Sequence, residues 1–148
     1  HEFTYTFVDH PGAVWIVPLT TERQVVFICQ YRYAVDEFCM EVPAGGLSPG
    51  LTPEEAAHRE LLEEVGGTVT DLRYVGQFYT SNGISNEVAY IYFASGVELG
   101  DSHREPTELM EICLLPVEEA LRRAREGRIS DGPSALALLW CDPLMKQG

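Results

Sequence analysis

The chain has 148 residues, of which 23 are acidic and 10 are basic, so its formal net charge is −13. A chain of that length buries about two-thirds of its unfolded surface when it folds. We therefore expect residues 1–148 to form one domain that needs no disulfide or metal cross-links. The negative charge opposes binding to nucleic-acid backbones and anionic membranes. The sequence contains no apolar run of the ~18 residues that a membrane span requires. It also lacks a basic region followed by an apolar one at its start, and a first residue other than Met indicates that residues precede His1.

The first third of the chain predicts β-strands, because short apolar runs alternate with turn residues. The turn signals are His10-Pro11-Gly12 and Thr21-Glu22-Arg23, and their close spacing favours antiparallel pairing. The predicted strands are Thr4–Val8, Ala13–Leu19, Gln24–Tyr31 and Phe38–Val42.

A helix is predicted from Pro53 to Val65. Thr52 can cap it, proline suits its first position, and Glu55 completes a T-x-x-E capping box three residues after Thr52. Gly66 supplies the backbone freedom that ends a helix. An apolar stripe on this helix should dock on a sheet, and it consists of Ala57, Leu61, Leu62 and Val65.

The second half predicts a β-hairpin, a further strand and two helices. The polar loop Ser81–Asn86 joins the hairpin strands, and Pro116 precedes an amphipathic helix on which arginines and glutamates alternate as a solvated face. The pattern as a whole is an α+β fold in which helices sandwich a mixed sheet. The predicted strands are Leu72–Tyr79, Glu87–Ala94 and Leu109–Leu115, and the last helix is Pro133–Cys141.

The four cysteines lie far apart and form no C-x-x-C pair. Most of them stand within apolar runs, so we interpret them as reduced core thiols of a cytoplasmic protein. They are Cys29, Cys39, Cys113 and Cys141.

Three glutamates on the predicted helix form a compact acidic group. Glu60 and Glu64 stand one turn apart, with Glu63 beside both. Like charges at this spacing cost about 0.2–0.5 kcal/mol per pair, and Arg59 offsets only part of that through its i, i+4 relation to Glu63. A divalent cation would make the arrangement favourable, because Mg²⁺ is held by one or two carboxylates together with phosphate and water oxygens. The alternative is a solvated acidic face.

The stretch from Gly45 to Gly67 resembles the Nudix box, G-x5-E-x7-R-E-U-x-E-E-x-G-U, in which U is apolar. Leu51 stands where the box has its first glutamate, which leaves the number or affinity of bound metal ions open. Gly67 stands where a bulky apolar residue is usual, and we expect it to loosen the packing after the helix. The matching residues are Gly45, Arg59, Glu60, Leu61, Glu63, Glu64 and Gly66.

Two further segments resemble the ADP-ribose pyrophosphatase branch of that family, namely Gln30-Tyr31-Arg32 and Glu41-Val42-Pro43-Ala44-Gly45. The resemblance implies a Nudix fold, an α/β/α sandwich with a mixed central sheet, and hydrolysis of the diphosphate linkage of ADP-ribose or a related nucleoside diphosphate sugar. For Arg32 the alternative is an ordinary strand arginine. The substrate contacts that the resemblance implies are Arg32, Glu41, Gly45, Ser81 and Asn82.

The loop at Ser81-Asn82-Gly83 departs from the Ser-Pro-Gly that is usual in this branch. The departure leaves other substrates open: GDP-mannose, nucleoside triphosphates or dinucleoside polyphosphates. A domain that senses a nucleotide without cleaving it is a further alternative.

The same resemblance implies a role for each site residue. The Ala44 carbonyl, Glu60 and Glu64 would bind two or more Mg²⁺ or Mn²⁺ ions, with Glu63 as a further ligand or water-orienting group, and Arg59 would steer the carboxylates. Glu108 is the expected general base, with Glu105 and Glu111 as rivals. Relatives are commonly homodimers whose N-terminal strands reach the partner's site, so we expect a homodimer here.

Overall fold

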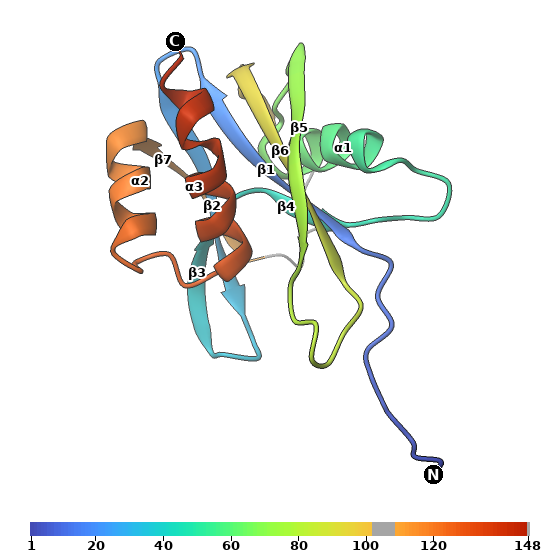
Figure 1. Ribbon diagram of the computed structural model, residues 1–148. Coiled ribbons are helices and arrows are strands. Elements are labelled where there is room, and N and C mark those ends of the chain that lie inside the picture. Colours follow the sequence, from blue (N-terminus) through green and yellow to red (C-terminus); the bar gives the residue numbers. More distant parts are fainter. Residues whose placement is uncertain (102–108, 148) are drawn as a thin grey trace.

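The computed structural model describes residues 1–101 and 109–147 and contains seven strands and three helices within those ranges (Figure 1). None of the helices in these ranges is both long and apolar enough to cross a membrane. The helices are α1 (Pro53–Val65), α2 (Val117–Arg125) and α3 (Gly132–Met145). The strands are β1 (Ala13–Thr20), β2 (Gln24–Arg32), β3 (Glu37–Glu41), β4 (Ala44–Gly46), β5 (Asp71–Tyr79), β6 (Val88–Val97) and β7 (Met110–Pro116).

All seven strands belong to one mixed sheet. Its main path runs β3-β2-β1-β6-β5, with β4 paired to β1 and β7 paired to β2. The β1–β6 pair is parallel, and the other pairs are antiparallel, including the predicted β5–β6 hairpin. The start of β1 pairs with β4, while Leu19 near its end pairs with Val25 of β2. The strand β4 therefore lies beside β1 at the end of the sheet where β2 has turned away.

Alternation along the strands creates a core on each face of the sheet. In β1, Val14 and Ile16 pack on the face that α1 covers, whereas Val17 and Leu19 pack on the face that α2 and α3 cover. This follows from the two-residue period of side chains in a strand. Figure 1 shows the three layers, with α1 on one side of the sheet and α2 and α3 on the other. The predicted α/β/α sandwich is confirmed.

The capping signals define α1 as predicted. The Thr52 hydroxyl accepts a hydrogen bond from the Glu55 amide at 3.2 Å, and the Glu55 carboxylate accepts one from the Thr52 amide at 2.8 Å. Gly66 takes a left-handed conformation, with φ of 62°, and its N–H points to the last carbonyls of the helix. The prediction for Leu62 is wrong, because its side chain is 44% exposed. Ala57, Leu61 and Val65 are buried as expected, and the rest of the buried face belongs to Ala56, Glu60 and Glu64.

The predicted strand Thr4–Val8 is also wrong, and a strand was missed. Within the described residues, the strand-type pairing of the segment Thr4–Val8 is limited to an isolated bridge between Val8 and Ser85, because no neighbouring strand offers it a ladder. The strand β4 escaped prediction because Ala-Gly-Gly has low β propensity, and it forms through its pairing with β1. The helix α3 continues beyond the predicted Cys141 to Met145.

Gly67 does not loosen the packing after α1. A Cβ atom there would lie 3.1 Å from side-chain carbons of Leu61 and Val65, and 3.2 Å from one of Val97. The expectation of a loose contact is therefore wrong, since the glycine lets strand and helix approach closely.

The exposed face of α2 is ion-paired, as its charge pattern predicts. Arg123 Nε lies 2.6 Å from Glu119 Oε1, and Arg122 pairs with both Glu119 and Glu126. Hydrogen bonds from Arg123 and Arg122 lower the pKa of Glu119 below its ordinary value. All four cysteines are free thiols, and burial raises the pKa of Cys141 to about 12.

The helix end at Gly66 gives a testable prediction. A Cβ atom at Gly66 would lie 2.4 Å from the Gly100 backbone, whereas one at Gly127, which also has positive φ, would meet nothing within 4 Å. We expect Gly127→Ala to lower the free energy of unfolding by about 1–2 kcal/mol through backbone strain alone. Gly66→Ala should lower it by about 3 kcal/mol or more, because a backbone clash is added. Urea unfolding measures both, and equal losses would contradict the predicted clash.

Candidate functional site

The start of β4 lies against α1. The Ala44 N–H donates a hydrogen bond to Glu64 Oε2 at 3.0 Å. Gly45 comes so close to Glu60 that a Cβ atom there would lie 2.1 Å from the Glu60 carboxyl carbon. Two carboxylates of one helix are therefore held against two consecutive residues of one strand, β4, and only glycine at position 45 leaves room for Glu60.

Both of these carboxylates are buried. Glu60 is 9% exposed and Glu64 is 8% exposed, whereas the Glu63 side chain is 48% exposed. A buried charge is costly unless it is paired, hydrogen-bonded or bound to a metal ion. A solvated acidic face describes Glu63 but does not describe Glu60 or Glu64.

Arg59 lies between the acidic side chains of α1 and Ser48, in the loop that follows β4. Its Nη2 atom lies 3.5 Å from Glu60 Oε1 and donates to Ser48 Oγ at 3.1 Å, and its Nε atom lies 3.7 Å from Glu63 Oε1. The predicted i, i+4 ion pair is present. The Nε atom is buried and has no hydrogen-bond acceptor within the described part of the chain. Its N–H is therefore a donor that an anion could satisfy.

The donor set fits a cation that substrate oxygens help to bind. Residues 1–101 and 109–147 contain no group of three or more His, Cys, Asp or Glu side chains arranged to hold a metal ion. Mg²⁺, however, is typically held by only one or two carboxylates, with phosphate and water oxygens completing its shell. Glu60 and Glu64 beside Ala44–Gly45 match that arrangement. The half-buried Leu51 side chain adds no oxygen, and the ligand roles of Ala44 and Glu63 stay predictions.

Arg32 and Glu41 form a second charged pair, on β2 and β3. Arg32 donates from Nε to Glu41 Oε1 at 2.8 Å and from Nη2 to Oε2 at 2.6 Å, and Glu41 is only 3% exposed. This forked geometry is a strong form of the charge-assisted hydrogen bond. The bonds to Glu41 raise the pKa of Arg32 above its ordinary value. Both residues line an open cleft of about 270 Å³ with Cys39, Ser130 and Asp131.

The loop that carries Ser81 and Asn82 contacts the N-terminal segment. The Ser81 carbonyl accepts from the amides of Ile84 and Ser85, at 3.1 and 3.0 Å, which closes a turn with Asn82 exposed. Tyr5 donates from its hydroxyl to the Gly83 carbonyl at 2.6 Å. Asn82 thus lies in a small cleft lined also by Tyr5, and its role in substrate binding stays a prediction.

The described residues do not decide among the three candidates for the general base, which are Glu105, Glu108 and Glu111. Glu105 and Glu108 lie outside the described residues. Glu111 is exposed on β7, where it pairs with Cys29 of β2.

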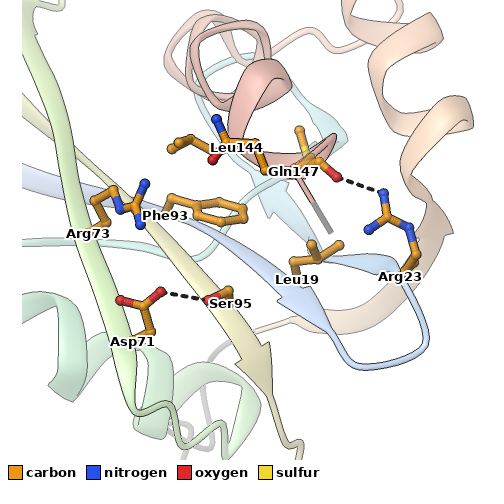
Figure 2. A pocket seen from close by; sticks show the side chains of 9 residues that line it. Leu19, Arg23, Asp71, Arg73, Phe93, Ser95, Leu144 and Gln147 are labelled. Carbon is orange, nitrogen blue, oxygen red and sulfur yellow. Dashed lines mark hydrogen bonds between the residues drawn. The ribbon is translucent and has the colours of Figure 1, made fainter.

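A further cavity, of about 220 Å³, lies on the other face of the sheet (Figure 2). Its floor includes Leu19 and Phe93, which belong to the core under α2 and α3, so it is separate from the acidic groups of α1. Arg23 donates to the Met145 carbonyl at 2.6 Å, and Ser95 donates to Asp71 at 3.0 Å. These polar groups have partners within the protein, and we do not assign the site to this cavity.

Two contacts, one to Arg59 of α1 and one to the backbone between β3 and β4, escaped the sequence analysis. Ser48 binds Arg59, and Ser134 on α3 accepts a hydrogen bond from the Val42 amide at 3.0 Å. The only sequence signal for Ser134 is the Asp131-x-x-Ser pattern of a helix N-terminus, which says nothing about a distant loop.

Comparison with known proteins decides the family. A family model of the NUDIX domain matches residues 9–135. The chain belongs to the Nudix family. It is 33% identical over 133 residues to the ADP-ribose pyrophosphatase of Bacillus subtilis, covering 88% of this chain and 72% of that protein. It is 32% identical over 139 residues to the GDP-mannose pyrophosphatase of Salmonella arizonae, covering 86% and 71% of the two chains.

The fold agrees with a solved structure. A crystal structure of an ADP compounds hydrolase superposes with a TM-score of 0.81 over 91% of this chain and 72% of that one, at 21% identity. At that identity the likeness shows the fold alone. The Nudix fold is confirmed, and this chain is a hydrolase of a family that generally needs divalent metal ions.

The contact between Gly45 and Glu60 predicts different Mn²⁺ affinities for two neighbouring glycine-to-alanine variants. Gly45→Ala should displace the Glu60 carboxylate, because its Cβ atom would overlap that group. Since Glu60 can rotate away, we expect a small loss of stability and about a 10-fold or larger loss of Mn²⁺ affinity. Gly46→Ala is the control, because its Cβ atom would meet only one atom, 4.0 Å away. Titration calorimetry with Mn²⁺ compares them, and equal affinities would remove the Gly45–Glu60 contact from the metal site.

Proposed function

We propose that this Nudix protein hydrolyses the diphosphate linkage of ADP-ribose or a related nucleoside diphosphate sugar to a nucleoside monophosphate and a sugar phosphate. The observation that carries the proposal is the pair of buried carboxylates, Glu60 and Glu64, held against Ala44 and Gly45. The relatives named ADP-ribose pyrophosphatase and GDP-mannose pyrophosphatase support it, since both names describe cleavage of a nucleoside diphosphate sugar.

The proposed site uses each charged side chain differently. Glu60 and Glu64 would bind two or more divalent ions, either Mg²⁺ or Mn²⁺. The Ala44 carbonyl and Glu63 would be further ligands. When bound, such ions neutralise phosphate charge and lower the pKa of a coordinated water. Arg59 orients Glu60 and offers its buried Nε–H to a phosphate oxygen. Without these positive charges, the net charge of −13 would repel the negatively charged diphosphate of the substrate.

The proposed reaction is an in-line displacement at phosphorus. The oxygen of water forms a bond to one phosphorus of the diphosphate, and the bond from that phosphorus to the bridging oxygen breaks. The bridging oxygen leaves with the other phosphate, and Glu108 accepts the proton of the attacking water. For ADP-ribose the products are AMP and ribose 5-phosphate.

We propose that the cleft beside Arg32 and Glu41 holds part of the substrate, with Gly45, Ser81 and Asn82 as further contacts. The cleft opens next to the segment that leads to Ala44, which supports this placement. GDP-mannose is a second candidate substrate, because a relative at 32% identity carries that name and Asn82 departs from the usual loop. A sensor that does not cleave its nucleotide is less well supported, since it needs no pair of buried carboxylates.

We further propose a cytoplasmic homodimer. The free thiols fit a reducing compartment. Exposed aromatic side chains alternate along the extended N-terminal segment at Phe3, Tyr5 and Phe7. Alternation places these side chains on one side of the segment, and such an apolar surface supports contact with a second copy.

The activity is tested by incubating the protein with Mg²⁺ or Mn²⁺ and separate substrates, then resolving the products by chromatography. The substrates are ADP-ribose, GDP-mannose, a dinucleoside polyphosphate and a nucleoside triphosphate. We expect AMP and ribose 5-phosphate from ADP-ribose. Glu60→Gln should lower kcat by about 10²-fold or more, because a bound metal ion supplies several kcal/mol of charge stabilisation. Glu54→Gln, an exposed substitution on the same helix, should leave kcat unchanged. Nucleotide binding without turnover would instead support the sensor. Preferred cleavage of GDP-mannose would show that GDP-mannose, and not ADP-ribose, is the better substrate.

The dimer is tested by light scattering coupled to size-exclusion chromatography. We expect twice the mass of the chain at micromolar concentration, and half of that after Phe3→Ser and Phe7→Ser are combined, because the exposed apolar surface is removed. A wild-type protein with the mass of one chain would rule out the homodimer.

A further inference from the structure

Three elements hold the backbone that connects β3 to β4. The Val42 N–H donates to Ser134 Oγ of α3 at 3.0 Å, and the Pro43 carbonyl accepts from the Ile16 amide of β1 at 2.9 Å. The next residue, Ala44, donates its N–H to Glu64 of α1. Consecutive residues are thus fixed from the α3 layer, the sheet and the α1 layer in turn.

Ser134 is fully buried, and its hydroxyl is oriented by Asp131. Asp131 Oδ2 accepts from the Ser134 amide at 3.1 Å and from its hydroxyl at 2.5 Å. A serine hydroxyl has one hydrogen, so donation to Asp131 leaves the oxygen lone pairs for the Val42 N–H. The N-cap residue of α3, Asp131, therefore orients the Ser134 hydroxyl so that its oxygen can accept the hydrogen bond from the Val42 amide.

Asp131 also faces the proposed substrate cleft. It lines that cleft with Arg32 and Glu41, and Glu41 directly precedes Val42. The hydrogen bonds that Arg32 donates to Glu41 are the main reason why the pKa of Arg32 is raised, and the negative charge of Asp131 raises it further. The Asp131–Ser134 pair thus contacts the segment that reaches Glu64 and borders the cleft as well.

We propose that Asp131 and Ser134 are positioning residues, which fix the segment 42–44 from the α3 layer so that the Ala44 N–H holds the Glu64 carboxylate in place. The proposal rests on the hydrolase function proposed above, and it adds residues that lie outside the Nudix box. Neither residue touches the reacting atoms, and both act through the backbone of Val42.

The decisive variant is Ser134→Ala, which removes the hydroxyl and leaves a buried N–H at Val42 without its acceptor. Displacing the segment should lower kcat about 10- to 100-fold with KM changed less than about 3-fold, because small misplacements near a reacting centre cost this much. Ser134→Thr keeps a hydroxyl and should restore kcat to within about 3-fold of wild type. A kcat for Ser134→Ala equal to that of wild type would overturn the proposal.

A control separates positioning from general stability. Leu121→Ala, on α2, removes a fully buried side chain from the core that α3 shares. It should lower Tm more than Ser134→Ala does, yet leave kcat within about 2-fold of wild type. If kcat falls with Tm in the same way for both variants, Ser134 has a structural role only, and the proposal fails.

A second readout does not depend on turnover. Amide hydrogen exchange followed by NMR should show the Val42 and Ala44 amides exchanging at least about 10-fold faster in Ser134→Ala, with amides of β6 unchanged. Unchanged exchange at both amides would overturn the proposal even if kcat fell. If the wild-type protein cleaves no substrate, the proposed function fails, while the exchange rates still decide whether Ser134 fixes the segment.

Discussion

The site depends on the close approach of one short strand, β4, to one helix, α1. Gly45 has no Cβ atom where the Glu60 carboxylate lies, and the Ala44 N–H meets Glu64 at 3.0 Å. That approach requires β4 to pair with the start of β1. It also requires α1 to pack on the face of the sheet to which Val14 and Ile16 of β1 point. The caps at Thr52 and Gly66 determine where α1 begins and ends, and so which residues its buried face contains.

The buried face of α1 serves two purposes that oppose each other. Ala57, Leu61 and Val65 dock the helix on the sheet, while Glu60 and Glu64 place two negative groups beside them. Burial of two like charges opposes folding, and a well-packed apolar pair would stabilise the protein more. Sites that bind charged ligands commonly carry such a cost in stability, because the groups that the ligand contacts are chosen for binding and not for folding. The ion-paired surface of α2, by contrast, has no such conflict.

Local signals in the sequence predicted much of the fold. The capping box and the C-terminal glycine gave the bounds of α1, and short apolar runs between turn signals predicted six of the seven strands in the described residues. The errors arose where tertiary contacts decide. Thr4–Val8 has strand-like composition but no ladder partner, and β4 has little propensity but pairs with β1. Leu62 was assigned to the apolar stripe of α1 but is exposed, whereas Glu60 and Glu64 belong to the buried face of that helix.

The spacing of the box predicted which residues form the site but not how each is used. It placed Glu60, Glu63 and Glu64 together on a helix, whereas the fold buries two of them and leaves Glu63 half exposed. The Arg32–Glu41 pair joins two strands, so its geometry follows only from their register. The link from Ser134 to Val42 spans two layers of the fold, and no periodicity along the chain encodes it.

The central claim is that a divalent cation binds between Ala44 and Gly45 of β4 and the buried carboxylates of α1. The most direct measurement is the broadening of backbone amide NMR signals when Mn²⁺ is added to the free protein. The account predicts that the signals of Gly45, Glu60 and Glu64 disappear first, while those of α2 persist at the same Mn²⁺ concentration. Broadening that begins at the exposed acidic groups of α2, or spreads evenly over the acidic surface, would contradict it.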